Sequence, residues 1–522
     1  RRNFCVKLKD FSEFNHKNKN FKLSNYINGE WRGTSKYEEF LDPLKGHKFL
    51  DVPLTEPTEM KDIITSMRNC PKYGLHNPLL NIDRYLLYGQ ICRKVTQALH
   101  DEEIFDHFIK LIQRVFPKST AQAYGEMKVT RAFFENFCGD NVRYLAGSKA
   151  SPGDHDGQQC MSYRWPYGPV SIITPFNFPL EISVLQLMGA LFMGNKVLLK
   201  VDSRVSLCIQ EFLRLLHACG LPHHDVILVH TNGPNMEYLL KEVDPRMTLF
   251  TGSSVVAERL SKVLHGRIKV EDAGFDWKIL GPDVSDVDYV AHISDQDSYA
   301  LSGQKCSAQS LVFAHKNWVN AKFFDRIKHY AEHRSLKNGT ISPVMTWNNK
   351  RIQEHVDKLL KIHGSQLLFG GEPVTEQHTI PDVYGSYKPT AIFIPLSEFD
   401  KHFELVTTEV FGPVQVVTEY NDEDLDHVFS IMDRLGNYLT AGVVSNDPKF
   451  LNRVLGHSVN GVTYSGIRAR TTGAPQNHWF GPCGDPRAGG IGTKEAIQLV
   501  WSSQREIITD VKFPKNFKVV QS

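Results

Sequence analysis

The sequence lacks the features that mark several specialised classes of protein. Its nine cysteines include no C-x-x-C pair and no regular spacing, which argues against a disulfide framework or a cysteine zinc site and favours a reducing compartment. Its 60 basic and 58 acidic residues nearly balance, and a formal net charge of +2 argues against nucleic acid or an anionic membrane as a partner. The longest mainly apolar stretch, residues 182–193, is too short to cross a bilayer and predicts a buried helix.

The start of the chain is unusual. It reads Arg1-Arg2-Asn3 without a methionine, and residues 1–22 are basic but have no apolar core like that of a signal peptide. We therefore expect a further N-terminal segment ahead of Arg1. With 522 residues, 41% hydrophobic and 23% charged, the chain has the composition of a globular protein of two or more domains.

The first third of the chain predicts a hairpin, a set of helices and an exposed strand. Asn28-Gly29 lies between strand-forming residues at 26–31, a strong hairpin signal. Residues 59–137 have helical periodicity with few breakers, which predicts a series of helices. Residues 160–167 are typical of an exposed strand that needs a partner edge.

From Gly168 onward, strands and helices alternate. This alternation predicts a parallel sheet with right-handed crossovers, an α/β fold class, and a second alternating block covers residues 310–460. The usual G-x-G-x-x-G fingerprint is absent, but Gly252 and Ser253 form a strand-to-helix turn where backbone N–H groups can hold a phosphate. The expected strands are 170–173, 196–200, 226–230 and 247–250, with helices from 180, at 205–218, at 236–242 and from 255.

Cys306 is the candidate nucleophile. It stands in L-S-G-Q-K-C-S-A-Q-S (301–310), among small and polar residues, and Gly303 permits close backbone approach. This setting suggests a thiol at the mouth of a helix, where the positive end of the dipole favours thiolate. The alternative is a buried structural cysteine.

Three other sites carry candidate chemistry. Asn177 lies between two prolines directly after a strand, so its amide is a stiffly held donor for an oxyanion; the alternative is a turn asparagine. Glu271 ends a strand beside small residues, where a carboxylate can act as general base or can simply be solvated. Glu409 can accept hydrogen bonds from ribose hydroxyls, and Phe411 can pack against a ring. His223, His224 and Asp225 have no metal-ligand spacing, and we predict no metal site.

Taken in order, these motifs resemble the aldehyde dehydrogenase superfamily, and the likeness extends over nearly the whole chain. Within it, the stretches T-P-F-N-F-P (174–179), G-Q-K-C-S-A (303–308) and T-T-G-A-P-Q-N-H-W-F-G (471–481) are similar to the plant-type Δ1-pyrroline-5-carboxylate dehydrogenases of family 12. The resemblance implies NAD-dependent oxidation of L-glutamate γ-semialdehyde to L-glutamate in proline catabolism, through a cysteine thiohemiacetal and thioester. Alternatives are another semialdehyde, such as succinate semialdehyde, a broad range of aldehydes, or a catalytically silent relative.

The resemblance also implies roles for individual residues. The catalytic residues would be Cys306, Glu271 and Asn177. NAD would be bound by Ile173, Thr174, Pro175, Phe176, Lys200, Gly252, Ser253, Glu409 and Phe411. The aldehyde substrate would be bound by Phe178, Ser307, Ala488 and Gly489, the last two through main-chain N–H groups.

The implied architecture has three parts: a Rossmann-like NAD-binding domain (1–149 and 168–280), an α/β catalytic domain (281–478) and oligomerisation strands (150–167 and 496–522). A homodimer or higher homo-oligomer in the mitochondrial matrix is expected. The sequence departs from the family pattern at E-D-A-G-F-D-W-K, where Asp272 stands beside the proposed base. It also has Ser203 three residues after Lys200, where many NAD-preferring relatives carry an acid.

Overall fold

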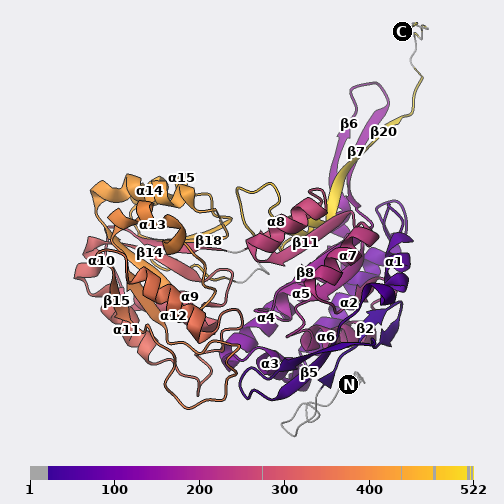
Figure 1. Ribbon diagram of the computed structural model, residues 1–522. Helices are drawn as coiled ribbons and strands as arrows, with labels where there is room; N and C mark the ends of the chain where they lie inside the picture. Colours follow the sequence, from indigo (N-terminus) through magenta and orange to yellow (C-terminus); the bar gives the residue numbers. More distant parts are fainter. Residues whose placement is uncertain are drawn as a thin grey trace.

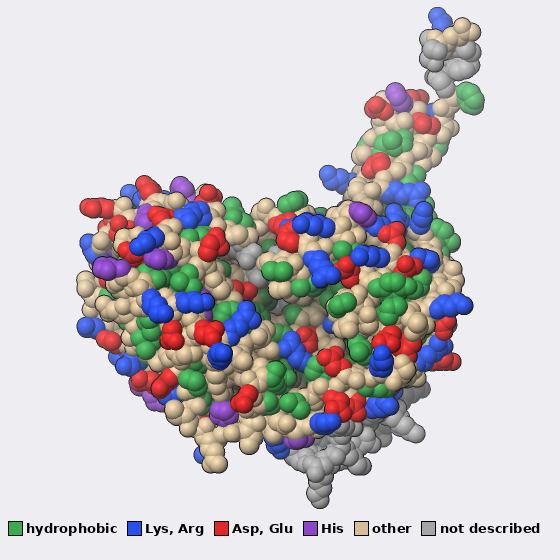
Figure 2. Space-filling view, viewed as in Figure 1, with side chains coloured by type: hydrophobic (Ala, Val, Ile, Leu, Met, Phe, Trp, Pro, Cys, Tyr) green, Lys and Arg blue, Asp and Glu red, His purple; other side chains and the backbone are tan. Residues whose placement is uncertain are grey.

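The computed structural model describes residues 21–272, 274–436, 438–473, 478–513, 516, 518 and 521. Two lobes stand side by side, each built on a seven-stranded sheet, and a narrow three-stranded arm projects from the first lobe (Figure 1). Charged side chains of both signs are intermixed over the face seen in Figure 2. Among the described helices, none is long and apolar enough to cross a membrane.

The sheet of the first lobe has the order β12-β11-β8-β9-β10-β2-β3. The five strands β8 to β12 run parallel to one another, which confirms the predicted α/β alternation. The hairpin prediction is also confirmed, because Asn28 and Gly29 both have positive φ (51° and 93°), as a two-residue type I′ turn requires. The strands are β2 Asn25–Ile27, β3 Glu30–Arg32, β8 Pro169–Thr174, β9 Lys196–Val201, β10 Val226–Leu228, β11 Met247–Gly252 and β12 Ile268–Asp272.

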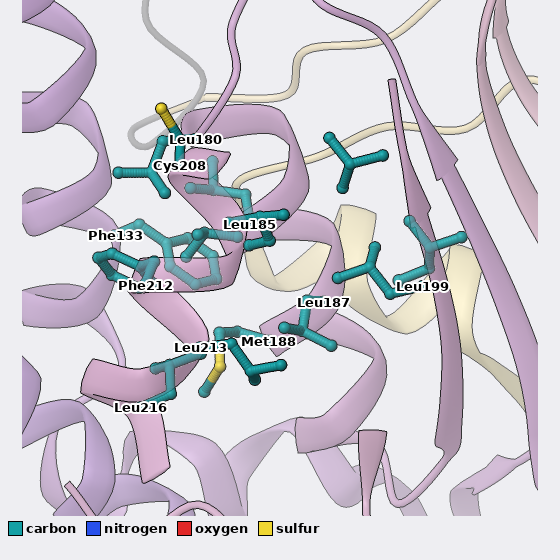
Figure 3. Packing of buried hydrophobic residues seen from close by; sticks show 14 of the residues in the cluster. Phe133, Leu180, Leu185, Leu187, Met188, Leu199, Cys208, Phe212, Leu213 and Leu216 are labelled. Carbon is teal, nitrogen blue, oxygen red and sulfur yellow. The ribbon is translucent and has the colours of Figure 1, made fainter. Parts of the chain in front are cut away.

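Helix α5 (Glu181–Phe192) occupies the centre of this lobe. All of its residues are buried, because it packs between the sheet and two further helices (Figure 3). Phe133 of α4 and Phe212, Leu213 and Leu216 of α6 cover it in that view. The start of α5 is thereby fixed in the core. The other helices of the lobe are α1 Lys61–Arg68, α2 Asp83–Leu99, α3 Glu102–Val115, α4 Thr120–Asn136, α6 Leu207–Ala218, α7 Gly233–Val243 and α8 Ser254–Val263, with 3-10 turns η2 Pro57–Glu59 and η3 Gly139–Ala146 and a small sheet of β1 Phe21–Lys22, β4 Tyr37–Leu41 and β5 Lys48–Pro53.

The sheet of the second lobe has the order β15-β16-β17-β14-β13-β18-β19, with β15 alone antiparallel to its neighbour. The predicted end of the first domain at residue 280 is wrong, because β13 (Asp276–Leu280) pairs with β14 and β18 here. A fully buried five-residue strand has no periodicity that tells which sheet it joins. The other strands are β14 Gln309–His315, β15 Gln366–Phe369, β16 Thr390–Phe393, β17 Val414–Tyr420, β18 Thr440–Val444 and β19 Val462–Ser465. The helices are α9 Val287–Tyr299, α10 Lys316–Asn320, α11 Phe323–Glu332, α12 Asn349–Leu359, α13 Phe399–Val406, α14 Leu425–Arg434 and α15 Pro448–Gly456, with η4 Ala300–Gly303, η5 Leu396–Glu398 and η6 Asp422–Asp424.

The arm consists of β6 (Gly147–Pro152), β7 (Gln158–Pro166) and β20 (Ser502–Asp510), in the order β20-β7-β6 (Figure 1). The expected strand from residue 496 is wrong in its first part, where the chain forms helix α16 (Lys494–Trp501). Thr493 caps this helix, and its apolar residues pack on Gly189 of α5. Only after Trp501 does the chain become extended.

Candidate active site

Cys306 lies in the turn between η4 and β14, at the inner edge of the second sheet. Leu301, Ser302 and Gly303 before it all adopt left-handed backbone conformations, with φ of 58°, 51° and 70°. Two successive non-glycine residues in this region are strained, and such strain concentrates at functional sites. The predicted helix mouth is wrong, because the apolar residues after Ser310 continue as strand β14 rather than as a helix.

Two glycines explain how the separate motifs meet around this turn. A Cβ on Gly303 would lie 2.2 Å from the carbonyl oxygen of Gly412, and one on Gly274 would lie 2.5 Å from the carbonyl oxygen of Cys306. The N–H of Gly274 also donates to Glu409 Oε1 at 3.3 Å. The segments around residues 274, 306 and 411 are therefore packed backbone to backbone.

The surroundings of Cys306 favour the neutral thiol over the thiolate. Burial raises its pKa well above the usual value, and the charge of Glu271 and a hydrogen bond with that carboxylate raise it further. No helix dipole offsets these effects, because a strand follows Cys306. What the site offers instead is a carboxylate beside the thiol that can accept its proton.

Glu271 lies on β12, is almost fully buried, and lines both of the cavities that meet at Cys306. The side chain of Asp272 and residues 474–477 of the T-T-G-A-P-Q-N-H-W-F-G stretch lie outside the described part of the chain.

A buried ion pair holds the loop that carries Asn177. Lys118 Nζ donates to the main-chain oxygen of Asn177 at 3.1 Å and to Glu126 Oε2 at 3.0 Å. Glu126 Oε1 in turn accepts from the N–H groups of Leu180 and Glu181, at 2.9 and 3.2 Å. Both side chains of the pair are 0% exposed. The backbone is thus fixed on both sides of residues 178–179, while Asn177 Oδ1 has no hydrogen-bond partner among the described residues.

One cavity extends from Cys306 over the carboxyl ends of the first sheet's strands, and a second, the outer cavity, adjoins it. All nine residues predicted to bind the cofactor line one or both of them: Ile173, Thr174, Pro175, Phe176, Lys200, Gly252, Ser253, Glu409 and Phe411. Ligands of open α/β sheets bind at this edge. The nine residues that the family resemblance assigns to the cofactor therefore lie along adjoining cavities.

The residues of this surface fit a dinucleotide. Ser253 occupies the N-cap position of helix α8, but its side chain makes no capping hydrogen bond. The N–H groups of the first turn are therefore suited to a phosphate. A Cβ on Gly252 would lie 2.7 Å from the ring of Phe250, so the turn has room for no larger residue. Phe411 adopts φ of 49°, a strained value for a bulky side chain, and lines the cavity next to Cys306.

An acid does stand near Lys200, at position 202 rather than 203. Asp202 lines the outer cavity, and the adjacent Arg204 guanidinium holds its pKa at about 2 against the effect of burial. Arg204 donates to both carboxylate oxygens at 3.0 and 2.7 Å, and to the carbonyl oxygen of Met345 at 2.7 Å. Asp202 directly precedes Ser203, the position at which the family resemblance suggested an acid.

The cavity on the other side of Cys306 contains Phe178 and Ser307, as predicted for the substrate. Ala488 and Gly489 do not line it. Their N–H groups already donate to the carbonyl oxygens of Asp485 and Val270, both at 2.9 Å. The predicted carboxylate site on these two N–H groups is not formed in this arrangement, because the segment pairs with the end of β12.

Sequence reasoning missed Lys118, Glu126, Glu181 and Lys305. Glu126, Glu181 and Lys305 line the cavity that contains Phe178 and Ser307, and Lys118 is bonded to Glu126 in its wall. Glu181 directly precedes the long apolar stretch, but an acid at that point is also an ordinary helix-start residue. Nothing in the spacing of Lys118 and Glu126 distinguishes a buried pair from a solvated one.

Residues 31–500 match the aldehyde dehydrogenase family, and the chain belongs to that family of oxidoreductases. The chain is 55% identical over 491 residues to the mitochondrial delta-1-pyrroline-5-carboxylate dehydrogenase 12A1 of Arabidopsis thaliana, covering 94% of this chain and 88% of that protein. It is 57% identical over 489 residues to a probable aldehyde dehydrogenase of Linum usitatissimum, covering 93% and 89%. A solved structure of PnpE in complex with nicotinamide adenine dinucleotide has the same fold, with a TM-score of 0.80, 19% identity and coverage of 95% and 99%.

Proposed function

We propose that this aldehyde dehydrogenase oxidises L-glutamate γ-semialdehyde, the open form of Δ1-pyrroline-5-carboxylate, to L-glutamate with NAD⁺. The observation that carries the proposal is the meeting of Cys306, Glu271 and Asn177 where two cavities join. One cavity has the lining of a dinucleotide site, and the other contains charged groups suited to a polar aldehyde. The identity to the Arabidopsis enzyme supports the choice of substrate.

In the first step, Cys306 Sγ attacks the aldehyde carbon while its proton passes to the carboxylate of Glu271. The side-chain amide of Asn177 and the N–H of Cys306 stabilise the oxyanion of the thiohemiacetal. The ion pair of Lys118 and Glu126 keeps the Asn177 loop in place during this step. The bound cofactor supplies the hydride acceptor.

Oxidation leaves a thioester on Cys306. Glu271 first passes the thiol proton to solvent, and its carboxylate then takes a proton from water, which attacks the acyl carbon. L-glutamate is released as the C–S bond breaks, and the proton on Glu271 returns to the sulfur. A single carboxylate thus serves both steps, which its contact with both cavities favours.

The residues that would hold the cofactor are those named above along the adjoining cavities. Glu409 and Lys200 are the polar groups suited to the two riboses, and Gly252 and Ser253 the turn suited to the pyrophosphate. We assign NAD⁺ rather than NADP⁺ because the ionised Asp202 stands beside Lys200 and occupies Arg204.

The arm of β6, β7 and β20 is proposed as the oligomerisation element of a homodimer or higher homo-oligomer. Within the described part of the chain, the two outer strands of the arm each have one unpaired edge, and Met161 and Ile508 are exposed. We assign the protein to the mitochondrial matrix, because its Arabidopsis relative is mitochondrial.

The test is NADH production by the purified protein over a panel of aldehydes that includes glutamate γ-semialdehyde, succinate semialdehyde and propanal. Turnover of none of them, with the cofactor bound, would contradict the proposal. The assembly is tested separately by size-exclusion chromatography with light scattering. The wild type is compared with the variant Met161→Lys/Ile508→Lys, which should form smaller particles.

A further inference from the structure

A buried glutamine stands two residues before Cys306. The side chain of Gln304 is 0% exposed, and both of its polar atoms are bonded. Its nitrogen donates to the carbonyl oxygens of Leu301 and Pro343, at 3.0 and 2.9 Å, and its oxygen accepts from the N–H of Met345 at 2.8 Å. Leu301 is one of the strained residues of the turn, and strained backbone persists only where its surroundings over-determine it. Gln304 supplies such a restraint.

Residues 342–345, here called the strap, connect this turn to the first lobe. The strap lies between α11 and α12 of the second lobe, and the N–H of Ser342 donates to Ser302 Oγ at 2.8 Å. Met345 is 4% exposed, and its side chain packs in the core of the first lobe. Its carbonyl oxygen accepts from Arg204 Nη1 at 2.7 Å. The strap is therefore bonded to the nucleophile's turn on one side and to the first lobe on the other.

Arg204 is itself held in one orientation. Its guanidinium donates to both carboxylate oxygens of Asp202 and lies 4.6 Å from the centroid of the Phe176 ring. A two-point pairing of this kind fixes the plane of the guanidinium, so its third bond, to Met345, has a fixed direction. Asp202 and Phe176 both line the outer cavity. The connection from the nucleophile's turn thus ends on the wall of the proposed cofactor site.

We propose that Arg204 and Gln304 are positioning residues that act as one unit, holding the Cys306 turn, through the strap, at a fixed place relative to the cofactor cavities. The inference rests on the proposed function only in taking Cys306 as the nucleophile. Hydride transfer requires the carbon on Cys306, in the second lobe, to face an acceptor that the first lobe would hold. A bonded connection across the lobe boundary sets that separation, and misplacement by about 1 Å can cost roughly 100-fold in rate.

The first test breaks the connection at each end. Gln304→Met removes the bonds of the amide. Asp202→Asn/Arg204→Met removes the bond to Met345 without leaving a buried carboxylate unpaired, and Asp202→Asn alone, which retains the guanidinium, is its control. At saturating NAD⁺, kcat for glutamate γ-semialdehyde should fall roughly 10- to 100-fold in Gln304→Met, and as much in Asp202→Asn/Arg204→Met relative to Asp202→Asn.

The two breaks are then combined. Because one break already frees the turn, adding Gln304→Met to Asp202→Asn/Arg204→Met should lower kcat little further. Losses that multiply, or wild-type kcat in Gln304→Met, would overturn the inference and leave the proposed function intact. Absence of turnover of every aldehyde by the wild type would instead overturn the proposed function.

Alkylation of Cys306 by iodoacetamide provides a readout that needs neither aldehyde nor cofactor. Burial raises the pKa of Cys306, so a loosened turn that admits water should move the pH profile of alkylation down by roughly one unit in both variants. Gln210→Met is the matched control, since Gln210 is a 1%-exposed glutamine of α6 that accepts from the N–H of Ser24 at 2.9 Å. It should lower stability and leave the profile unchanged. A profile unshifted in both test variants would overturn the inference.

A last measurement needs no variant. The N–H groups of Ser342 and Met345 bond to side chains of the turn, and that of Gln304 bonds to Leu301 within it. If the turn and the strap open together, hydrogen exchange of these three amides in the wild type, followed in rising denaturant, should agree within roughly threefold after correction for intrinsic rates. A difference of roughly tenfold or more would overturn the inference even if the variants fail to fold.

Discussion

The two cavities that meet at Cys306 differ in how their charges are arranged. In the outer cofactor cavity, the carboxylate of Asp202 is paired with Arg204 before any ligand arrives. In the cavity on the other side of Cys306, Glu181 and Lys305 make no hydrogen bond or close ion pair with a described residue, although their charges act on each other. A paired charge shapes a surface and rejects some ligands, whereas an unpaired buried charge awaits its counter-ion from the ligand. On one side of Cys306 the charged groups are therefore paired before a ligand binds, and on the other side a ligand can still pair with them.

Replacement of Cys306 should abolish the reaction but leave binding of the cofactor intact. Cys306→Ala should lower turnover by roughly 10⁴-fold or more, because no neighbouring group replaces the thiol. The dissociation constant of NAD⁺, measured by quenching of protein fluorescence, should stay close to the wild-type value. Wild-type turnover in this variant would refute the assignment of the nucleophile.

Glu271 is the carboxylate that both cavities share, and its charge raises the pKa of Cys306. Glu271→Gln should therefore lower that pKa, so that alkylation of Cys306 by iodoacetamide begins at lower pH than in the wild type. Hydrolysis of the thioester should slow roughly 10²- to 10⁴-fold, and more than hydride transfer, because the lower pKa of Cys306 offsets the loss of its proton acceptor; a burst of NADH should therefore appear or grow. An unshifted alkylation profile, or hydrolysis of the thioester at the wild-type rate, would contradict these roles of Glu271.

The Lys118–Glu126 pair holds the Asn177 loop beside Cys306. Lys118→Met leaves the carboxylate of Glu126 buried without its cation, which should lower the free energy of unfolding by about 3–5 kcal/mol. The Asn177 loop should also loosen, so kcat for every aldehyde should fall more than the affinity for NAD⁺. The double variant Lys118→Met/Glu126→Gln is the control, since it removes both charges and should recover part of the stability. If chemical denaturation shows that the two variants are equally stable, the pair has no such role.

Asp202 bears on the choice of cofactor, where the expected effect is smallest. The wild type should use NAD⁺ in preference to NADP⁺. Asp202→Asn removes the negative charge and releases Arg204, so the ratio of kcat/KM for NADP⁺ to that for NAD⁺ should rise roughly tenfold. Ser203→Ala is the matched control and should leave the ratio unchanged. A ratio unaffected by Asp202→Asn would show that Asp202 does not read the cofactor.

The cofactor side could be predicted from the sequence because its residues lie on turns at the ends of successive parallel strands. Such turns carry local signals, as Gly252 and Ser253 after β11 show. The substrate side brings together α4, α5 and the Cys306 turn, and no local signal distinguishes a buried Glu181 or Lys305 from a solvated one. The state of the Cys306 thiol and the bonding of Ala488 and Gly489 depend on long-range packing against β12, which short motifs do not encode.

The measurement that tests the account most directly is kcat/KM of the purified wild type, followed as NADH formation, for glutamate γ-semialdehyde against succinate semialdehyde. The account predicts a preference of at least roughly tenfold for glutamate γ-semialdehyde, because the charged lining of the cavity beside Cys306 and the identity to the Arabidopsis enzyme both favour that substrate. An equal or greater kcat/KM for succinate semialdehyde would contradict it.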